Sequence, residues 1–343
     1  MSMVRPRVVL LGVLSLCFCA EPDATPRAPS GAGPSGEVRL YVADRYEGVF
    51  QLDPQTLAIL DTIPTGPRPH GLVASPDGRW LFITVETTNE LLKVDVLTHE
   101  IVGRVDVGPV PNEPTVSRDG RHVFVPQRRG DQTAIVETET MSVVKTLPAG
   151  REQHNAYTSH DGRRVYVTAM GDSLITVIDP ARLEIERKIP VGGIPRPVAF
   201  SANDSIAYVA LSGMIGFVTL DLATDRVIDR LELPIPAGTP PPLLETYTHG
   251  ILLTPDEKEL WLAVYALDRV LAFSLPGNRP LADLVVGEGP HWFTLHPDGE
   301  PLYVSLERAG QVAAIHRGLR EVMRKQPAGQ GPTRILAFRG PAQ

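Results

Sequence analysis

The sequence predicts an all-β protein, a seven-bladed β-propeller of four-stranded blades, because a strand-rich unit recurs along the chain at a fixed spacing. The period is 42 residues, and glycines mark it at Gly66, Gly108, Gly150 and Gly192, then again at Gly287 and Gly329. Two further periods and an insertion of eleven residues separate the two series. A period near 40 with strand-like content is typical of propellers, in which each repeat forms one blade.

Each repeat contains four short runs rich in β-branched, aliphatic and aromatic residues. In the repeat that starts at Gly66, these runs cover residues 71–74, 80–85, 90–95 and 101–105. An Asp-Gly pair separates the first two runs of four repeats: Asp77-Gly78, Asp119-Gly120, Asp161-Gly162 and Asp298-Gly299. Asp-Gly between apolar runs indicates a β-hairpin, because both residues tolerate positive φ angles. Each repeat is therefore expected to form a four-stranded antiparallel sheet.

The two ends of the chain complete the seventh blade. A strand-like run at 333–339 has no outer strands after it, and runs at 38–43, 48–53 and 58–63 lack an inner strand before them. Pairing the C-terminal run with the N-terminal ones closes the ring and removes the exposed sheet edges. We therefore expect the ring to close by pairing of the N- and C-terminal strands.

Short motifs within the repeats resemble those of a known family. Tyr166-Val167-Thr168-Ala169 ends a second strand, and Tyr41, Tyr208 and Tyr303 begin variants of the same motif. The stretch 69–78, which reads PHGLVASPDG, precedes one such strand. Over residues 38–340 the chain resembles the YVTN family of seven-bladed β-propeller repeat proteins, related in architecture to WD40 repeats. The resemblance implies the fold but no single function, since the family includes surface proteins, lipoproteins and redox-associated modules.

The N-terminal region has the pattern of an export segment. Arg5 and Arg7 precede an apolar stretch at 8–18 that is too short to span a membrane, and the two cysteines, Cys17 and Cys19, stand at its end. Either these are ordinary residues near a cleavage site, or one of them is lipidated, since 14–17 resembles a bacterial lipobox apart from Leu16.

These patterns predict three regions, namely an export segment of the signal or lipoprotein type at 1–19, a flexible linker rich in Pro, Gly and Ser at 20–37, and a propeller at 38–343. The protein is expected to be exported, to the periplasm or cell surface, and to be tethered to a bacterial membrane by a lipid anchor. The net charge of −7 argues against a nucleic-acid partner.

One ring of polar residues stands out. Four residues after each phasing glycine, or at the equivalent position, lie His70, Asn112, His154, Arg196, His249, His291 and Thr333. In a propeller this position begins the innermost strand, so the seven side chains, with the adjacent Glu113, are expected to line one mouth of the central channel. A second ring follows the second strand of each blade and is chemically mixed, so it is expected to be variable loop surface: Asp44, Glu86, Arg128, Met170, Ser212, Tyr265 and Glu307.

The histidine ring allows more than one interpretation. The first is a mouth that binds a small molecule, peptide or protein, with Arg196 pairing with Glu113 or an anionic ligand. The second is a Cu or Zn site, because neutral imidazoles suit these metals, formed by His70, His154, His249 and His291. The third is a lining that duplication has copied without function.

No enzyme motif is present, such as H-E-x-x-H, G-x-S-x-G, a Walker loop or C-x-x-C. We therefore expect a binding or scaffolding module rather than an enzyme, and no catalytic residue is assigned. A metal- or redox-cofactor protein that uses the channel histidines is the alternative, and a lactonase-like hydrolase on the same fold is a third reading.

Overall fold

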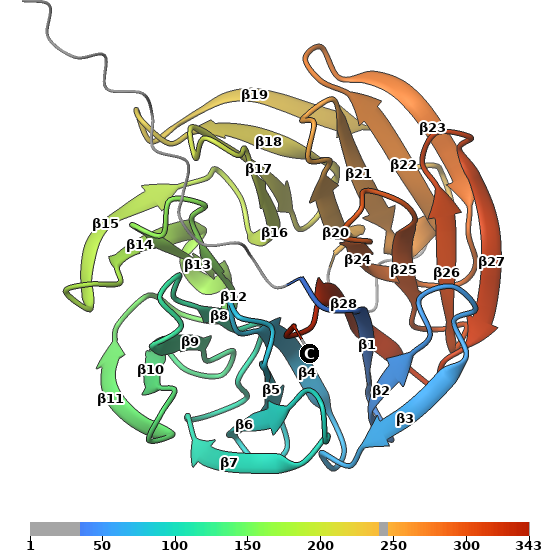
Figure 1. Cartoon of the computed structure of the whole chain (residues 1–343). Coiled ribbons are helices and arrows are strands. Elements are labelled where there is room, and N and C mark those ends of the chain that lie inside the picture. Colours follow the sequence, from blue (N-terminus) through green and yellow to red (C-terminus); the bar gives the residue numbers. More distant parts are fainter. Residues whose placement is uncertain (1–34, 240–245, 343) are drawn as a thin grey trace, which may run out of the picture. The chain divides into compact units, whose positions relative to one another are not determined.

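The computed structural model describes residues 35–239 and 246–342. These residues form seven four-stranded antiparallel sheets arranged in a ring, with two single-turn 3₁₀ helices, η1 (Met170–Asp172) and η2 (Tyr265–Leu267) (Figure 1). The prediction of an all-β seven-bladed propeller is confirmed. The predicted export segment and all but the last residues of the predicted linker, with Cys17 and Cys19, lie outside the described residues.

The blades follow one another in the chain, each beginning with its inner strand. Blade one comprises β4 (Pro69–Ala74), β5 (Trp80–Val85), β6 (Glu90–Asp95) and β7 (Ile101–Asp106). Blade two comprises β8 (Thr115–Val116), β9 (His122–Pro126), β10 (Thr133–Glu137) and β11 (Ser142–Leu147). Blade three comprises β12 (Gln153–Thr158), β13 (Val165–Ala169), β14 (Leu174–Asp179) and β15 (Glu184–Pro190).

The remaining blades repeat this order. Blade four comprises β16 (Pro195–Phe200), β17 (Ile206–Leu211), β18 (Ile215–Asp221) and β19 (Arg226–Leu233). Blade five comprises β20 (Thr248–Leu253), β21 (Glu259–Val264), β22 (Arg269–Ser274) and β23 (Arg279–Val285). Blade six comprises β24 (Pro290–Leu295), β25 (Leu302–Leu306), β26 (Gln311–His316) and β27 (Glu321–Pro327).

Blade seven joins the two ends of the chain, as predicted. Its inner strand is β28 (Pro332–Arg339), followed by β1 (Val38–Asp44), β2 (Gly48–Leu52) and β3 (Ile59–Ile63). β28 runs antiparallel to β1, with Val38 opposite Arg339 at one end and Asp44 opposite Pro332 at the other. The predicted closure of the ring is therefore confirmed.

The core lies between the blades. The second strands are continuous apolar runs, and β5 and β13 are buried along almost their whole lengths because both sheet faces pack against a neighbouring blade. Outer strands such as β15 alternate between partly buried and exposed residues, since only one face is covered. In the described part of the chain, no helix has the length and hydrophobicity needed to cross a membrane.

The inner strand of blade two is shorter than the repeat predicts. β8 has only two residues, and Asn112 precedes it in a segment held by an isolated bridge between Pro111 and Gln127. Proline has no backbone N–H to donate to a ladder, so Pro111 and Pro114 interrupt the regular pairing here. The backbone N–H of Asn112 still donates to the carbonyl of Pro126, at 2.9 Å, which keeps Asn112 in its predicted place on the ring.

Candidate ligand site at the channel mouth

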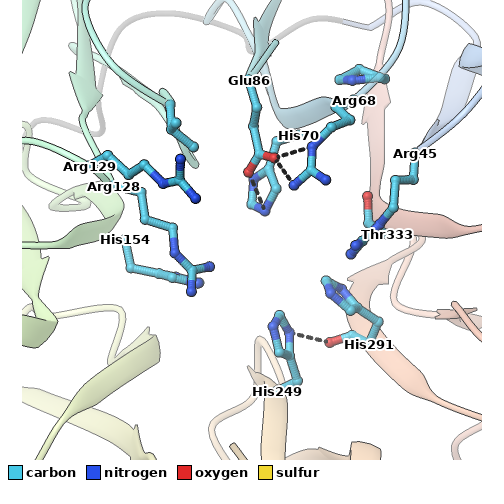
Figure 2. A pocket seen from close by; sticks show the side chains of 12 residues that line it. Arg45, Arg68, His70, Glu86, Arg128, Arg129, His154, His249, His291 and Thr333 are labelled. Carbon is cyan, nitrogen blue, oxygen red and sulfur yellow. Dashed lines mark hydrogen bonds and ion pairs between the residues drawn. The ribbon is translucent and has the colours of Figure 1, made fainter. Parts of the chain in front are cut away.

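The structure brings the channel histidines together at one mouth of the propeller. His70, His154, His249 and His291 begin β4, β12, β20 and β24, next to the channel axis (Figure 2). The ring centroids of His249 and His291 lie 3.7 Å apart, those of His154 and His249 6.1 Å, and those of His70 and His154 6.3 Å. The four imidazoles therefore lie close to one another at this level of the channel.

The tautomer of His249 follows from its hydrogen bond. Its Nδ1 lies 3.3 Å from the backbone carbonyl oxygen of His291, and a carbonyl can only accept a hydrogen bond. Nδ1 therefore carries the proton, and Nε2 holds a lone pair. The ring points into the cavity (Figure 2), so this lone pair is an acceptor offered to whatever occupies the mouth.

His154 is held in the same tautomer by different partners. Its Nδ1 contacts Oδ1 of Asn155, which also accepts a hydrogen bond from Nη2 of Arg334 at 3.3 Å. Nε2 of His154 lies 3.2 Å from Nη1 of Arg196, whose guanidinium can only donate. His154 is therefore already satisfied at both nitrogens, unlike His249.

All four imidazoles are neutral at physiological pH. Burial lowers the pKa of each well below its usual value near 6.5, because a charged ring would lose its hydration. Nearby cations add to this effect, above all Arg334 for His70 and His291, and Arg196 for His154. The four imidazoles thus form a polar but uncharged part of the ring.

Arg334 extends from blade seven to residues of three other blades, Glu113, Asn155 and Trp292. Its side chain is 1% exposed, its guanidinium carbon lies 3.6 Å from the ring centroid of Trp292, and its Nε lies 2.6 Å from Oε2 of Glu113. Burial raises the pKa of Glu113 to about 7, and the Arg334 guanidinium partly offsets this rise. Glu113 therefore pairs with Arg334, whereas one prediction paired it with Arg196. The repeat could not indicate this pair, because it does not show how far a long side chain crosses the channel.

We expect Arg334→Met to destabilise the protein by about 3–5 kcal/mol at pH 8, because it leaves Glu113 buried without its cation. The folded-state pKa of Glu113 already lies above its unfolded value and rises further in this variant. The folded state therefore binds the extra proton, and the loss should be smaller at pH 6 than at pH 8. Urea unfolding at both pH values measures the difference.

The double variant Glu113→Leu/Arg334→Met is the matched control. It removes both charges, so it should recover most of the stability lost by Arg334→Met. Equal destabilisation by Arg334→Met at pH 6 and pH 8 would show that Glu113 and Arg334 do not interact in this way.

A cavity of about 490 Å³ opens above the histidine layer. Its wall contains Arg45, Arg68, Arg128, Arg129, His70, Glu86, Pro69, Val110, His154, His249, His291 and Thr333. Arg45 pairs with Glu307 and Arg68 with Glu86, each at 2.5 Å. Across residues 35–239 and 246–342, neither Arg128 nor Arg129 forms an ion pair. One wall of the mouth therefore carries uncompensated positive charge.

Two members of the second ring, Glu86 and Arg128, line this cavity, and the prediction that the ring is loop surface is wrong. Asp44, Glu86, Tyr265 and Glu307 are buried, and Arg128 lines the cavity. In an antiparallel pair the end of the second strand lies beside the start of the first, so both rings meet at the same mouth. The recurrence of carboxylates and arginines at one position of the repeat is the sequence signal that indicates a polar site at this mouth.

The ring residues are not equally available to a ligand. Asn112 is fully buried, and its side-chain amide has no hydrogen-bond partner in the described part of the chain. The hydroxyl group of Thr333 donates a hydrogen bond to the carbonyl of Ala43 at 3.2 Å. Arg196 donates to Ser212 at 3.0 Å as well as contacting His154. The described residues contain no group of three or more His, Cys, Asp or Glu placed to hold a metal ion, so a site for Cu or Zn stays a prediction.

Comparison with known proteins supports the fold. Residues 41–160, about a third of the chain, match the family model for the cytochrome D1 heme domain. A comparison with curated proteins finds no match.

Among solved structures, the periplasmic gluconolactonase PpgL of Pseudomonas aeruginosa is 18% identical, with a TM-score of 0.72 over 89% of this chain and 100% of its own. A putative 6-phosphogluconolactonase from Bacteroides uniformis is 15% identical, with a TM-score of 0.71 over 88% and 99%. The dihydro-heme d1 dehydrogenase NirN, in complex with DHE, is 15% identical, with a TM-score of 0.63 over 87% and 74%. Identities this low show a shared fold alone.

Proposed function

We propose that this propeller is a binding module whose channel mouth takes a small anionic molecule. The observation that carries the proposal is the pair Arg128 and Arg129, which line the cavity without a carboxylate partner in the described chain. A guanidinium binds carboxylate or phosphate through two parallel hydrogen bonds, and such charge-assisted bonds are the stronger ones. Figure 2 shows both side chains on one wall, facing the same space as the histidines.

The surroundings strengthen the field of this arginine pair. The chain as a whole is negative, with a net charge of −7, so the positive mouth is a local feature. Clefts with low-dielectric walls and charge of one sign concentrate ions of the opposite sign. The buried guanidinium of Arg334, which contacts Glu113 and Trp292, adds a further positive charge close to the histidines.

We expect hexanoate to bind the purified protein and Arg128→Gln/Arg129→Gln to weaken that binding about tenfold or more, because two charge-assisted contacts are lost. Isothermal titration calorimetry at pH 7.5 measures the affinity. Binding should also weaken with added salt, since the contact is largely electrostatic.

Arg163→Gln/Arg164→Gln is the matched control, because it also removes two positive charges from consecutive arginines. Unlike Arg128 and Arg129, these two arginines form ion pairs, with Asp161 and Glu186. It should leave the affinity for hexanoate unchanged. An equal loss in both double variants, or an affinity for hexanoate that Arg128→Gln/Arg129→Gln leaves unchanged, would contradict an anion site at Arg128 and Arg129.

A haem-type tetrapyrrole is the second candidate ligand, because the family match spans much of the mouth, including Arg45, Arg68, His70, Arg128 and His154. Arginines suit the carboxylates of such a group, and an imidazole suits its iron. The walls do not fit the macrocycle, since Pro69 and Val110 are the apolar residues of the described lining and a flat ring needs apolar faces. If haemin bound tightly and competed with hexanoate, a tetrapyrrole would be preferred over a small anion as the ligand.

The remaining expectations from the sequence stay proposals. We propose that the protein is exported and held at a membrane through Cys17 or Cys19, on the strength of the pattern in residues 1–19. The YVTN-type motifs support membership of that family. A metal- or redox-cofactor role for the four histidines and a lactonase-like activity are the alternatives. A peptide or protein at the propeller face is the alternative partner.

A further inference from the structure

We propose that the ligand of this mouth is a small polyhydroxylated monocarboxylate, an acid with one anionic end and hydroxyl groups along its body. This inference rests on the proposed anion site and adds the chemistry of the rest of the molecule. Three features of the cavity carry it: the position of its uncompensated positive charge, an unsatisfied acceptor on a histidine, and the pairing of the other arginines with Glu86 and Glu307.

The anionic end is placed by the arginines. Arg128 and Arg129 lie in the turn between β9 and β10, and no described carboxylate neutralises them. Arg45 and Arg68 are also in the wall, but Glu307 and Glu86 already hold them at 2.5 Å. One carboxylate is therefore expected to bind at Arg128 and Arg129 in preference to any other part of the mouth.

The body of the ligand must donate hydrogen bonds to the inner layer. His249 is fixed by the carbonyl of His291 in the tautomer that leaves a lone pair on Nε2, and this nitrogen has no partner among the described residues. A carboxylate oxygen would repel that lone pair, and an alkyl chain would leave it unsatisfied at a cost of about 1–3 kcal/mol. A hydroxyl group can donate to it and can also accept from a neighbour.

A second anionic group would be disfavoured on the far side. Figure 2 shows Glu86 across the cavity from His249, with its carboxylate directed toward His70 and Arg68. Glu307 lies behind Arg45 in the same way, with Oε2 3.9 Å from Nε2 of His291. Arg68 and Arg45 are therefore already paired on this side of the cavity. A second carboxylate would lose its hydration there without gaining an unpaired cation, so a dicarboxylate should bind less well than a monocarboxylate.

The cavity has room for such a molecule. Its volume of about 490 Å³ lies in the range of small-ligand sites. Its wall is dominated by guanidinium, imidazole and carboxylate groups, with two apolar residues in the described lining, Pro69 and Val110. A compact polar body fits these walls, whereas a long alkyl chain does not.

The test compares three probes by calorimetry at pH 7.5, a pH at which the histidines are neutral. Gluconate carries one carboxylate and several hydroxyls, hexanoate has the same chain length without hydroxyls, and glucarate adds a second carboxylate. We expect gluconate to bind about tenfold more tightly than hexanoate, the equivalent of one or more hydrogen bonds, and more tightly than glucarate.

Variants then locate the difference. His249→Ala should reduce the ratio of gluconate to hexanoate affinity toward one, and His249→Gln, which keeps an acceptor, should restore part of it. Arg129→Gln should weaken both ligands by the same factor. Thermal melts of each variant identify any that fail to fold, and the probe comparison with the unmodified protein stands without them.

The outcomes separate the two proposals. If hexanoate and gluconate bind equally and both depend on Arg128 and Arg129, the anion site stands and the hydroxylated ligand is wrong. If glucarate binds most tightly, the carboxylates of Glu86 and Glu307 do not act as argued. If no probe binds, both proposals fail together.

Discussion

A chain truncated after residue 331 should fail to form a cooperatively folded propeller. The truncation removes β28, which is the inner strand of blade seven and the partner of β1. It leaves an unpaired edge along β1, removes Thr333 and Arg334 from the channel, and opens the ring between blades six and seven. The lost contacts should exceed the 5–15 kcal/mol or so by which folded domains are stable. Circular dichroism melts and gel filtration measure the result.

Truncation after Gly340 is the control. It keeps every residue of β28 and the hydrogen bond from the backbone N–H of Gly340 to the carbonyl of Glu37, at 2.9 Å. This shorter truncation should melt like the full chain. A cooperative melt within a few degrees of normal for the truncation after residue 331 would show that pairing of the ends is dispensable.

Acid should destabilise the protein well before most carboxylates are protonated. The four channel histidines have folded-state pKa values far below the unfolded value near 6.5. The unfolded state therefore binds protons first, so stability is complete above pH 6.5 or so and falls as the pH drops below it. Each such group contributes up to about 1.4 kcal/mol per pH unit. Together the four histidines should lower the free energy of unfolding by several kcal/mol between pH 7 and pH 5.

Glu113 has the opposite effect on the pH dependence of stability, but it is a single group against four histidines. Burial raises its pKa to about 7 from an unfolded value near 4.5, so its protonation favours the folded state as the pH falls between these values. Urea unfolding at pH 8, 7, 6 and 5 gives the slope, and His70→Gln should reduce it by about one group's share. A free energy of unfolding that does not change between pH 7 and pH 5 would mean that the imidazoles are not held neutral.

The period predicted the blades well because two independent signals coincide in four of the repeats. A glycine precedes six of the inner strands, and an Asp-Gly turn such as Asp77-Gly78 separates the first two strands in four of these repeats, so strand order and register follow. The shared seventh blade could be predicted by counting strands left over at the two ends. The same counting could not foresee the two-residue β8, because the prolines flanking it act through a missing backbone donor.

The site was harder to predict than the fold. The ring position of the histidines follows from the repeat, but their tautomers depend on which neighbour faces each nitrogen, as with His249 and the carbonyl of His291. Arg334 was missed because it comes one residue after the phase of the ring, and its reach across the channel to Glu113 depends on side-chain length. Burial of Glu86 and Glu307 likewise follows from the close approach of neighbouring strands at the mouth.

The register of β1 against β28 also gives the propeller a polarity. At one end of this pair Asp44 and Pro332 lie beside Arg45 and Thr333 in the mouth, and at the other end Val38 lies opposite Arg339. The described chain therefore enters the propeller at the face opposite the arginines and histidines. Val38 and Arg339 thus share the face away from the mouth, and the ring closes without either residue occupying the cavity.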